Sequence, residues 1–295
     1  MKIRLILFVL FSQYFSYAQE EYPLNYYWDQ DKKEAMIGAK NCYVRSEPNT
    51  SARLLDSLQL GKKIQIVSQT EIFQKIKGIN TNWTEIEYVD KKGESLKGFI
   101  WRGFLALDFT EEGSETFLTT INKITKKVDN DNYEKVTFHV GIQVLDKENK
   151  LLAEKVLERS LLESNFFQNK TIGSLGLINV KNIYRIAFQG QACGVPSYYF
   201  YFGWNGKELI ELPEKMEVGD AGVFYHSEVF LFPKEPGGKP NFIFKNIEEA
   251  EVVEGIESTS LVFDVVKSKE TYSWDGKKAT LIKTQKFKKF RKTVD

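Results

Sequence analysis

Residues typical of catalytic and metal sites are scarce in this sequence. Two histidines and two cysteines occur among 295 residues, and no His-x-x-x-His or Cys-x-x-Cys spacing is present. Zinc sites need several such ligands, usually at short spacings. We therefore expect no metal site and no cofactor.

Long hydrophobic runs are also absent, except for one at the N-terminus. Lys2 and Arg4 precede an apolar run from Leu5 to Phe11, and a small-residue end follows at Ser16-Tyr17-Ala18. The run is shorter than the roughly 20 residues that span a membrane. Its pattern is typical of a secretory signal peptide over residues 1–18. We expect an exported protein, periplasmic or extracellular, with no transmembrane segment after cleavage.

Neither sign of charge dominates, and helix-forming runs of Ala, Leu and Glu are rare. The chain carries 41 Lys and Arg against 40 Asp and Glu, so no global electrostatic argument favours nucleic acid as a partner. Aromatic residues make up 14% of the chain, which favours a mostly β protein. Cys42 and Cys193 fall in different predicted domains, so we expect two free thiols, with one disulfide as the alternative.

Short strands and turns follow the first forty residues. Ser46–Asn49 holds a proline and an asparagine and predicts a turn. Ile64 and Ile66 alternate with polar residues, as do Ile86 and Tyr88, which predicts two half-buried strands. Strands this short bury a core of their own only by curling into a small barrel.

The same stretch, residues 37–107, resembles the bacterial SH3-type family. The matching residues are Asn41–Ser51, Leu58, Gly61, Ile64, Trp83, Ile86, Gly98–Ile100 and Leu105. Two departures stand out. Phe99 replaces the tryptophan that is usual in the family, and about nine additional residues, Glu71–Ile79, lengthen the segment before Trp83.

The resemblance implies a non-catalytic module that binds peptides or the peptide stems of cell walls. Its groove is expected beside Tyr43, Trp83, Phe99 and Trp101, because exposed rings supply the stacking and apolar contact that peptide grooves use. The alternative is that the two tryptophans belong to the core of the barrel.

The remainder of the chain predicts a larger antiparallel β domain. Val136–Val144 alternates strictly between apolar and polar residues, whereas residues 117–128 fit a helix or a strand. Tyr201–Ile210 and Tyr272–Ile282 echo each other, each with a Trp-Asn-Gly-Lys or Trp-Asp-Gly-Lys hairpin signal. This pair is similar to repeat units of secreted β-propeller-like proteins, and a sandwich is the alternative.

The expected fold is thus mostly β, with a small SH3-like barrel followed by a larger antiparallel β domain, propeller-like or sandwich. The expected segments are a signal peptide (1–18), a lead-in that packs through its aromatic residues (19–36), the SH3-type domain (37–107), a linker (108–114) and the β-rich domain (115–295).

Few residues support a catalytic or metal-dependent alternative. Cys193 lies among small residues with His226 downstream, but a strand pattern follows it where a cysteine nucleophile needs a helix start. His139 falls on the polar phase of its strand and is expected at the surface. Asp129–Asn132 lacks the glycine and distal glutamate of a calcium loop and predicts a turn.

Three further polar segments predict loops or a strand end. Residues 219–222 and 233–240 read as loops, and the second is either a rim for binding or a plain connector. Lys283–Lys292 holds six cations and two phenylalanines, which suits contact with an anionic surface or a solvated strand end.

The sequence therefore predicts an exported, non-catalytic binding protein of the bacterial cell envelope. Its SH3-type domain would bind peptide or cell-wall material, with peptidoglycan or an envelope protein as partner. Two alternatives stay open: a cell-wall hydrolase that uses this domain for targeting, and an envelope scaffold that only positions its partners.

Overall fold

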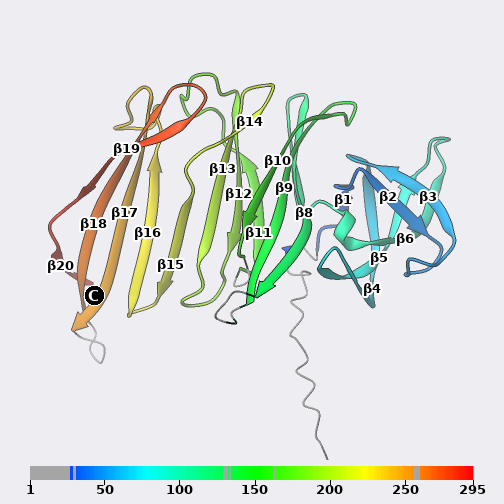
Figure 1. Ribbon diagram of the computed structural model, residues 1–295, viewed down its shortest axis with the longest axis horizontal. Coiled ribbons are helices and arrows are strands. Elements are labelled where there is room, and N and C mark those ends of the chain that lie inside the picture. The colour runs from blue at the N-terminus through cyan, green and yellow to red at the C-terminus, as the bar shows by residue number, and fades with distance from the viewer. Residues whose placement is uncertain are drawn as a thin grey trace, which may run out of the picture.

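The computed structural model describes residues 27–28, 31–128, 132, 134–161, 164–254 and 260–294. Within these ranges the chain forms strands β1 to β20 and a short 3-10 helix, η2 (Arg102–Phe104), and the strands pair antiparallel. A small curled sheet is followed by larger antiparallel sheets (Figure 1), which confirms the predicted mostly β fold. The predicted signal peptide lies outside the described residues.

The first six strands form a sheet that curls on itself, here called the curled sheet. They are β1 (Glu34–Met36), β2 (Asn41–Arg45), β3 (Leu54–Gln59), β4 (Lys63–Ile76), β5 (Ile79–Val89) and β6 (Ser95–Trp101), in the order β1-β4-β5-β6-β2-β3. Alternation places Cys42 and Val44 inside and Tyr43 outside. Ile64 and Ile86 are buried in the same core, as their patterns predicted.

The predicted turn before β3 has a simple local cause. Asn49 accepts a hydrogen bond from the Ser51 backbone N–H at 3.0 Å, and the Ser46 N–H donates to the carbonyl of Arg53. These bonds satisfy backbone groups that cannot join the ladder. The Ser46–Asn49 segment is therefore framework, as its turn chemistry indicated.

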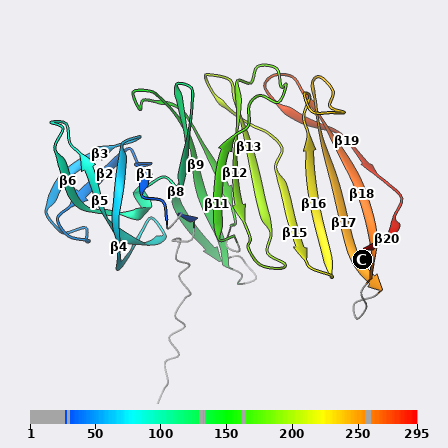
Figure 2. The same cartoon turned by 180° about the vertical axis from the view of Figure 1, so that it is seen from behind.

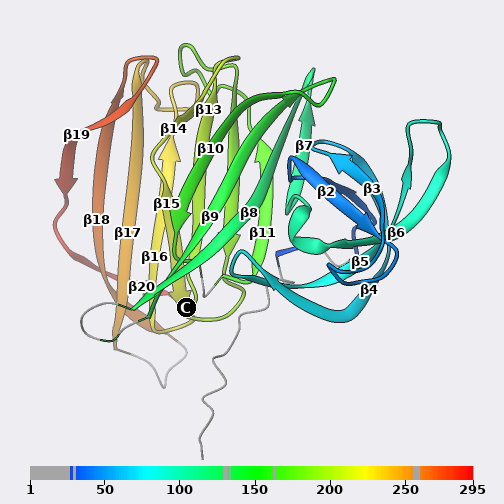
Figure 3. The same cartoon turned by 45° about the vertical axis from the view of Figure 1, so that its right-hand side comes forward.

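Two further layers face each other after the curled sheet. One contains β7 (Asp108–Glu112), β8 (Glu115–Val128), β9 (Glu134–Asp146) and β10 (Leu151–Arg159), and the other begins with β11 (Phe166–Thr171), β12 (Asn182–Gln189), β13 (Ser197–Trp204) and β14 (Leu209–Glu211). Figure 3 shows β9 and β10 crossing in front of β11 to β13. Phe117 and Phe138 from one layer share a core with Phe188 and Phe202 from the other. Of the two predicted arrangements, this packing is that of a sandwich.

The second layer continues past the sandwich as one long sheet. Its further strands are β15 (Lys215–Asp220), β16 (Phe224–Leu231), β17 (Phe242–Glu254), β18 (Leu261–Trp274), β19 (Ala279–Lys286) and β20 (Phe290–Val294). β14 pairs with β13 and β20 pairs with β18, so both lie off the main path of the sheet. Figures 1 and 2 show β15 to β20 side by side, beyond the strands of the first layer.

The two echoing segments form matching hairpins, β13–β14 and β18–β19. In each, the side chain after the tryptophan accepts two backbone N–H bonds: Asn205 from Lys207 and Glu208, and Asp275 from Lys277 and Lys278. These bonds lower the pKa of Asp275. The loops span 205–208 and 275–278, so they are wider than two-residue turns, because the capping side chain accepts two backbone N–H groups. The repeated hairpin itself is confirmed.

Two other segments differ from their prediction or resolve it. The predicted linker, residues 108–114, instead contains strand β7, which pairs with β8 through Asp108↔Thr119 to Glu112↔Glu115. Polar composition suggested a break, but half-buried edge strands also carry polar residues. Residues 117–128, which fitted a helix or a strand, lie in β8.

Candidate functional site

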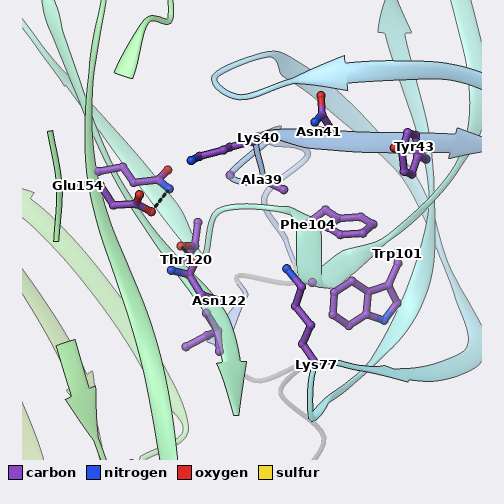
Figure 4. Close-up of a pocket in the computed structure, with 14 residues that line it drawn as sticks. Ala39, Lys40, Asn41, Tyr43, Lys77, Trp101, Phe104, Thr120, Asn122 and Glu154 are labelled. Atoms are coloured by element: carbon purple, nitrogen blue, oxygen red, sulfur yellow. Dashed lines mark hydrogen bonds between the residues drawn. The ribbon is translucent and has the colours of Figure 1, made fainter. Parts of the chain in front are cut away.

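A cavity of about 500 Å³ lies where the curled sheet meets the outer face of the sandwich. Figure 4 shows its side chains reaching in from both units. Its lining comes from the turn after β1 (Gly38–Lys40), β2 (Asn41, Tyr43), the β4–β5 tip (Lys77), the end of β6 with η2 (Trp101, Gly103, Phe104), β8 (Thr120–Asn122), β9 (Gln143) and β10 (Glu154). The cavity therefore depends on both units.

The wall on the side of the curled sheet is aromatic. Tyr43 points outward from β2 and is 46% exposed. Trp101 is only 1% exposed, and its indole N–H donates to the carbonyl of Gln74 at 2.9 Å. Phe104 packs edge-on against Trp101, with ring centroids 5.2 Å apart. This wall offers apolar surface with one polar tip, the Tyr43 hydroxyl.

The wall on the side of the sandwich is built from polar side chains of neighbouring strands. The Gln143 Nε2 donates to Glu154 Oε1 at 3.0 Å, and the Thr120 hydroxyl donates to Asn122 Oδ1 at 2.7 Å. Gln143 is 3% exposed, and its Oε1 is buried with no hydrogen-bond partner. A buried acceptor without a donor costs about 1–3 kcal/mol.

The additional residues of the SH3-like stretch close one side of the cavity. Glu71–Ile79 lengthen the β4–β5 hairpin, whose tip is Lys77-Gly78, and the carbonyl of Lys77 accepts the Ile124 N–H of β8 at 3.0 Å. Gly78 has φ +78°, and a Cβ there would lie 2.1 Å from the Ile124 carbonyl oxygen. Only glycine permits this contact, which fixes the tip on the sandwich.

Two lysines reach the cavity from the turns that border it. Gly38 allows the turn after β1 to approach β8, because a Cβ there would lie 2.3 Å from Thr120 Cγ2. Figure 4 shows Lys40, from this turn, directed toward Glu154, and Lys77 rising from the hairpin tip into the space between the two walls. The cavity thus has two cations and one carboxylate on its lining.

The lead-in segment helps to hold the two units together. The Trp28 indole N–H donates to the carbonyl of Ala106 at 3.0 Å, and the Tyr27 hydroxyl donates to the carbonyl of Leu161 at 2.8 Å. Both rings are buried in the core of the sandwich. The lead-in was predicted to pack through its aromatic residues, and these two do so. Tyr26, the third neighbouring aromatic residue of the predicted lead-in, lies outside the described residues.

The four residues predicted to bind ligand separate into two pairs. Tyr43 and Trp101 line the cavity, whereas Trp83 and Phe99 do not. Trp83 is 2% exposed and its indole N–H donates to Gln74 Oε1 at 2.9 Å. The expectation of exposed rings was therefore wrong for both tryptophans, because the sandwich covers the face of the curled sheet on which they lie. Ligand binding by the other two stays a prediction.

The polar half of the site could not be read from the sequence. Thr120, Asn122, Gln143 and Glu154 belong to the part of the chain after the SH3-like stretch, and only the fold brings them to the cavity. The Lys77-Gly78 pair, which lies in the additional residues, was the one local signal, since Gly after a polar residue is typical of a tight hairpin tip.

The histidines have structural partners. His139 is buried, with Nδ1 3.0 Å from Glu158 Oε1 and Nε2 3.0 Å from the Thr125 hydroxyl, so its predicted surface position was wrong. Side chains of the neighbouring strands cover the outer face of β9 at this point. His226 has Glu249 at Nδ1 and Glu228 at Nε2, both at 3.1 Å, which leaves neither ring nitrogen available as a base for Cys193.

Other predicted features are loops or solvated strands. The loop predicted over 219–222 begins too early, because Gly219 and Asp220 still belong to β15 and the turn spans 221–223. Residues 233–240 connect strands as predicted, and most of Asp129–Asn132 lies outside the described residues. Lys283–Lys292 lies in and between β19 and β20 and is exposed throughout, with Lys289 and Arg291 paired to acids. Across the described ranges, no three or more His, Cys, Asp and Glu side chains are grouped to hold a metal ion. Nor does that part of the chain contain a helix long and apolar enough to cross a membrane.

Both cysteines are free thiols in very different surroundings. Cys42 is fully buried in the curled sheet, and burial raises its pKa, whereas Cys193 is exposed. Because the thiolate is the reactive form, we expect a thiol reagent to modify one site in the native protein and two after denaturation. Mass spectrometry after labelling, with Cys193→Ser as control, measures this. Native labelling of Cys42 at the rate of Cys193 would contradict the packing of β2.

Comparisons of the chain with protein-family models, with curated proteins and with solved structures gave no match.

Proposed function

We propose that this protein is an exported, non-catalytic binding protein of the bacterial cell envelope, and that the cavity between the curled sheet and the sandwich binds peptide or cell-wall material. The observation that carries the proposal is the pairing of two unlike walls. An exposed tyrosine and a phenylalanine face a polar wall built from the hydrogen-bonded pairs Thr120–Asn122 and Gln143–Glu154. Ligand sites commonly combine apolar surface with a few fixed polar groups.

The sequence resemblance supports the same kind of ligand. Asn41–Ser51 and Gly98–Ile100, which resemble the bacterial SH3-type family, lie in the curled sheet that supplies the aromatic wall. The N-terminal pattern of residues 1–18 supports export to the compartment where cell-wall material is found. The lengthened β4–β5 hairpin, a departure from the family pattern, borders the cavity. We therefore do not carry the ligand specificity of the family over to this chain.

We infer binding without catalysis from the groups on the lining. Among the described residues that line the cavity, Glu154 is the one carboxylate, it accepts a hydrogen bond from the Gln143 amide, and no histidine or cysteine occurs. Hydrolysis of a glycoside or a peptide usually needs a second carboxylate, a nucleophile with its base, or a metal. The alternative of a cell-wall hydrolase is an outcome of the following test.

Co-sedimentation of the chain from Gln19 to Asp295 with purified peptidoglycan sacculi tests the proposal. We expect saturable binding and no soluble peptide or sugar fragments in the supernatant. Release of fragments would replace the proposal by the hydrolase alternative. Absence of sedimentation would contradict wall binding and favour the scaffold alternative, which capture from an envelope fraction would then examine.

A further inference from the structure

Positive charge is concentrated at the C-terminal end of the long sheet. Residues 277–294 hold eight of the 41 Lys and Arg of the chain and none of its 40 Asp and Glu. They form β19, β20 and the loops beside them, and Figures 1 and 2 show these strands at the end of the molecule away from the curled sheet. Such an asymmetry of charge is typical of segments that contact an anionic surface.

Strand register brings lysines from three strands to one face of this sheet, here called the basic face. Lys267 and Lys269 come from β18, Lys283 from β19 and Lys292 from β20. The residues of β18 that pair with Lys283 and Lys292 alternate in phase with Lys267, and such residues share a face. Among the described strand residues of this face in β16 to β20, Glu248 is the one carboxylate, and it pairs with Lys267 at 2.8 Å.

Two phenylalanine rings are exposed among these lysines. Phe290 is 41% exposed, and the Lys267 Nζ lies over its ring, 5.4 Å from the centroid. Phe287 is 46% exposed, and its backbone N–H donates to the carbonyl of Lys267 at 2.9 Å. Phe287, Lys267 and Lys292 line one hollow together with Val229, which is also exposed. Cations and apolar groups are therefore adjacent and accessible on the same face.

We propose that the basic face binds an anionic lipid surface, with its lysines on the headgroups and the two phenylalanine rings in the interface. Lys283 and Lys292 are exposed and form no ion pair among the described residues, so their charges are available to lipid phosphates. The exposed rings favour a bilayer over a soluble polyanion, because a bilayer interface takes up apolar groups as well as charges. A second copy of the chain is disfavoured, since lysine-rich edge strands repel each other.

This inference goes beyond the proposed function and does not depend on it. The cavity lies beside the curled sheet, whereas Figure 1 shows β18 to β20 at the opposite end of the long sheet. Lipid contact would therefore leave the cavity accessible. Because salt screens attraction between exposed charges, binding should be reversible and should weaken as the ionic strength rises.

Flotation of the chain from Gln19 to Asp295 with lipid vesicles tests the inference. We expect vesicles with about 30 mol% phosphatidylglycerol to bind at least about tenfold more tightly than pure phosphatidylcholine vesicles, since each lysine near an anionic surface contributes about fivefold. Equal binding to the two compositions, or binding to neither, would overturn the inference.

A pair of lysine variants tests the location of the contact. Lys283→Gln/Lys292→Gln should weaken binding to the anionic vesicles at least about tenfold. Lys91→Gln/Lys92→Gln, on the exposed turn after β5, removes the same charge from the curled sheet and should leave binding unchanged. An equal loss in both double variants would contradict a specific basic face.

A pair of phenylalanine variants separates a bilayer from a soluble polyanion. Phe287→Ala should weaken binding to the anionic vesicles at least about threefold, because the ring enters the interface. Phe73→Ala removes a ring of similar exposure, 44%, from β4 and should have no effect. If Phe287→Ala bound these vesicles as tightly as the wild type, the rings would take no part, and the lipid proposal would give way to a soluble polyanion.

Discussion

Gly78→Ala is expected to lower the free energy of unfolding by about 2–4 kcal/mol, since it combines backbone strain with a steric clash. The residue has φ +78°, where a Cβ costs about 1–2 kcal/mol. The same Cβ would also lie 2.1 Å from the Ile124 carbonyl oxygen, so the hairpin tip must leave β8. Lys77 would then move away from the cavity, and binding should weaken along with stability.

Gly93→Ala is the matched control for this variant. Gly93 has φ +86° and would place its Cβ in open space, with nothing within 4 Å. It therefore measures the backbone strain alone, about 1–2 kcal/mol. Chemical denaturation of the two variants isolates the contact between the hairpin tip and β8. Equal destabilisation in both would show that the tip does not dock on the sandwich.

Trp83→Ala should destabilise the protein by about 3–5 kcal/mol, the usual cost of removing a buried tryptophan. The indole packs in the core that contains Phe117 and Phe138, and its N–H is held by Gln74 Oε1 at 2.9 Å. Chemical denaturation followed by far-UV circular dichroism, a signal that does not rely on tryptophan fluorescence, measures the change in the free energy of unfolding. Tyr43→Ala, which removes an exposed ring, should change stability by less than about 0.5 kcal/mol.

The opposite result for Trp83 would restore its role at a ligand surface. If Trp83→Ala kept the stability of the wild type and lost affinity for sacculi, the ring would have to be accessible, contrary to its burial in the structure. We expect Trp83→Ala to keep the wild-type fold at low temperature but to lose stability. That combination identifies Trp83 as a core residue and not a binding residue.

Local chemistry made much of the fold predictable from the sequence. Strict alternation in Val136–Val144 identified β9, and the Asp146 side chain accepts the backbone N–H groups of Glu148 and Lys150 in the turn that follows. The two Trp-x-Gly-Lys hairpins were found in the same way. Such features depend on residues a few positions apart, so composition and periodicity suffice to recognise them.

Long-range packing accounts for most of what the sequence did not indicate. Trp83 and Trp101 have the pattern of groove residues, yet the sandwich covers them, because the curled sheet buries one face against a second unit. His139 lies on the polar phase of β9, yet Glu158 and Thr125 enclose it. No local pattern reveals such neighbours, which lie in other strands.

The affinity for sacculi of Tyr43→Ala compared with Phe73→Ala tests the location of the site most directly. Both rings are similarly exposed, at 46% and 44%, but only Tyr43 lines the cavity. Because an aromatic anchor typically contributes more than about 1 kcal/mol, we expect Tyr43→Ala to weaken co-sedimentation at least about fivefold and Phe73→Ala to leave it unchanged. Equal binding by the two variants would contradict the assignment of the cavity as the binding site.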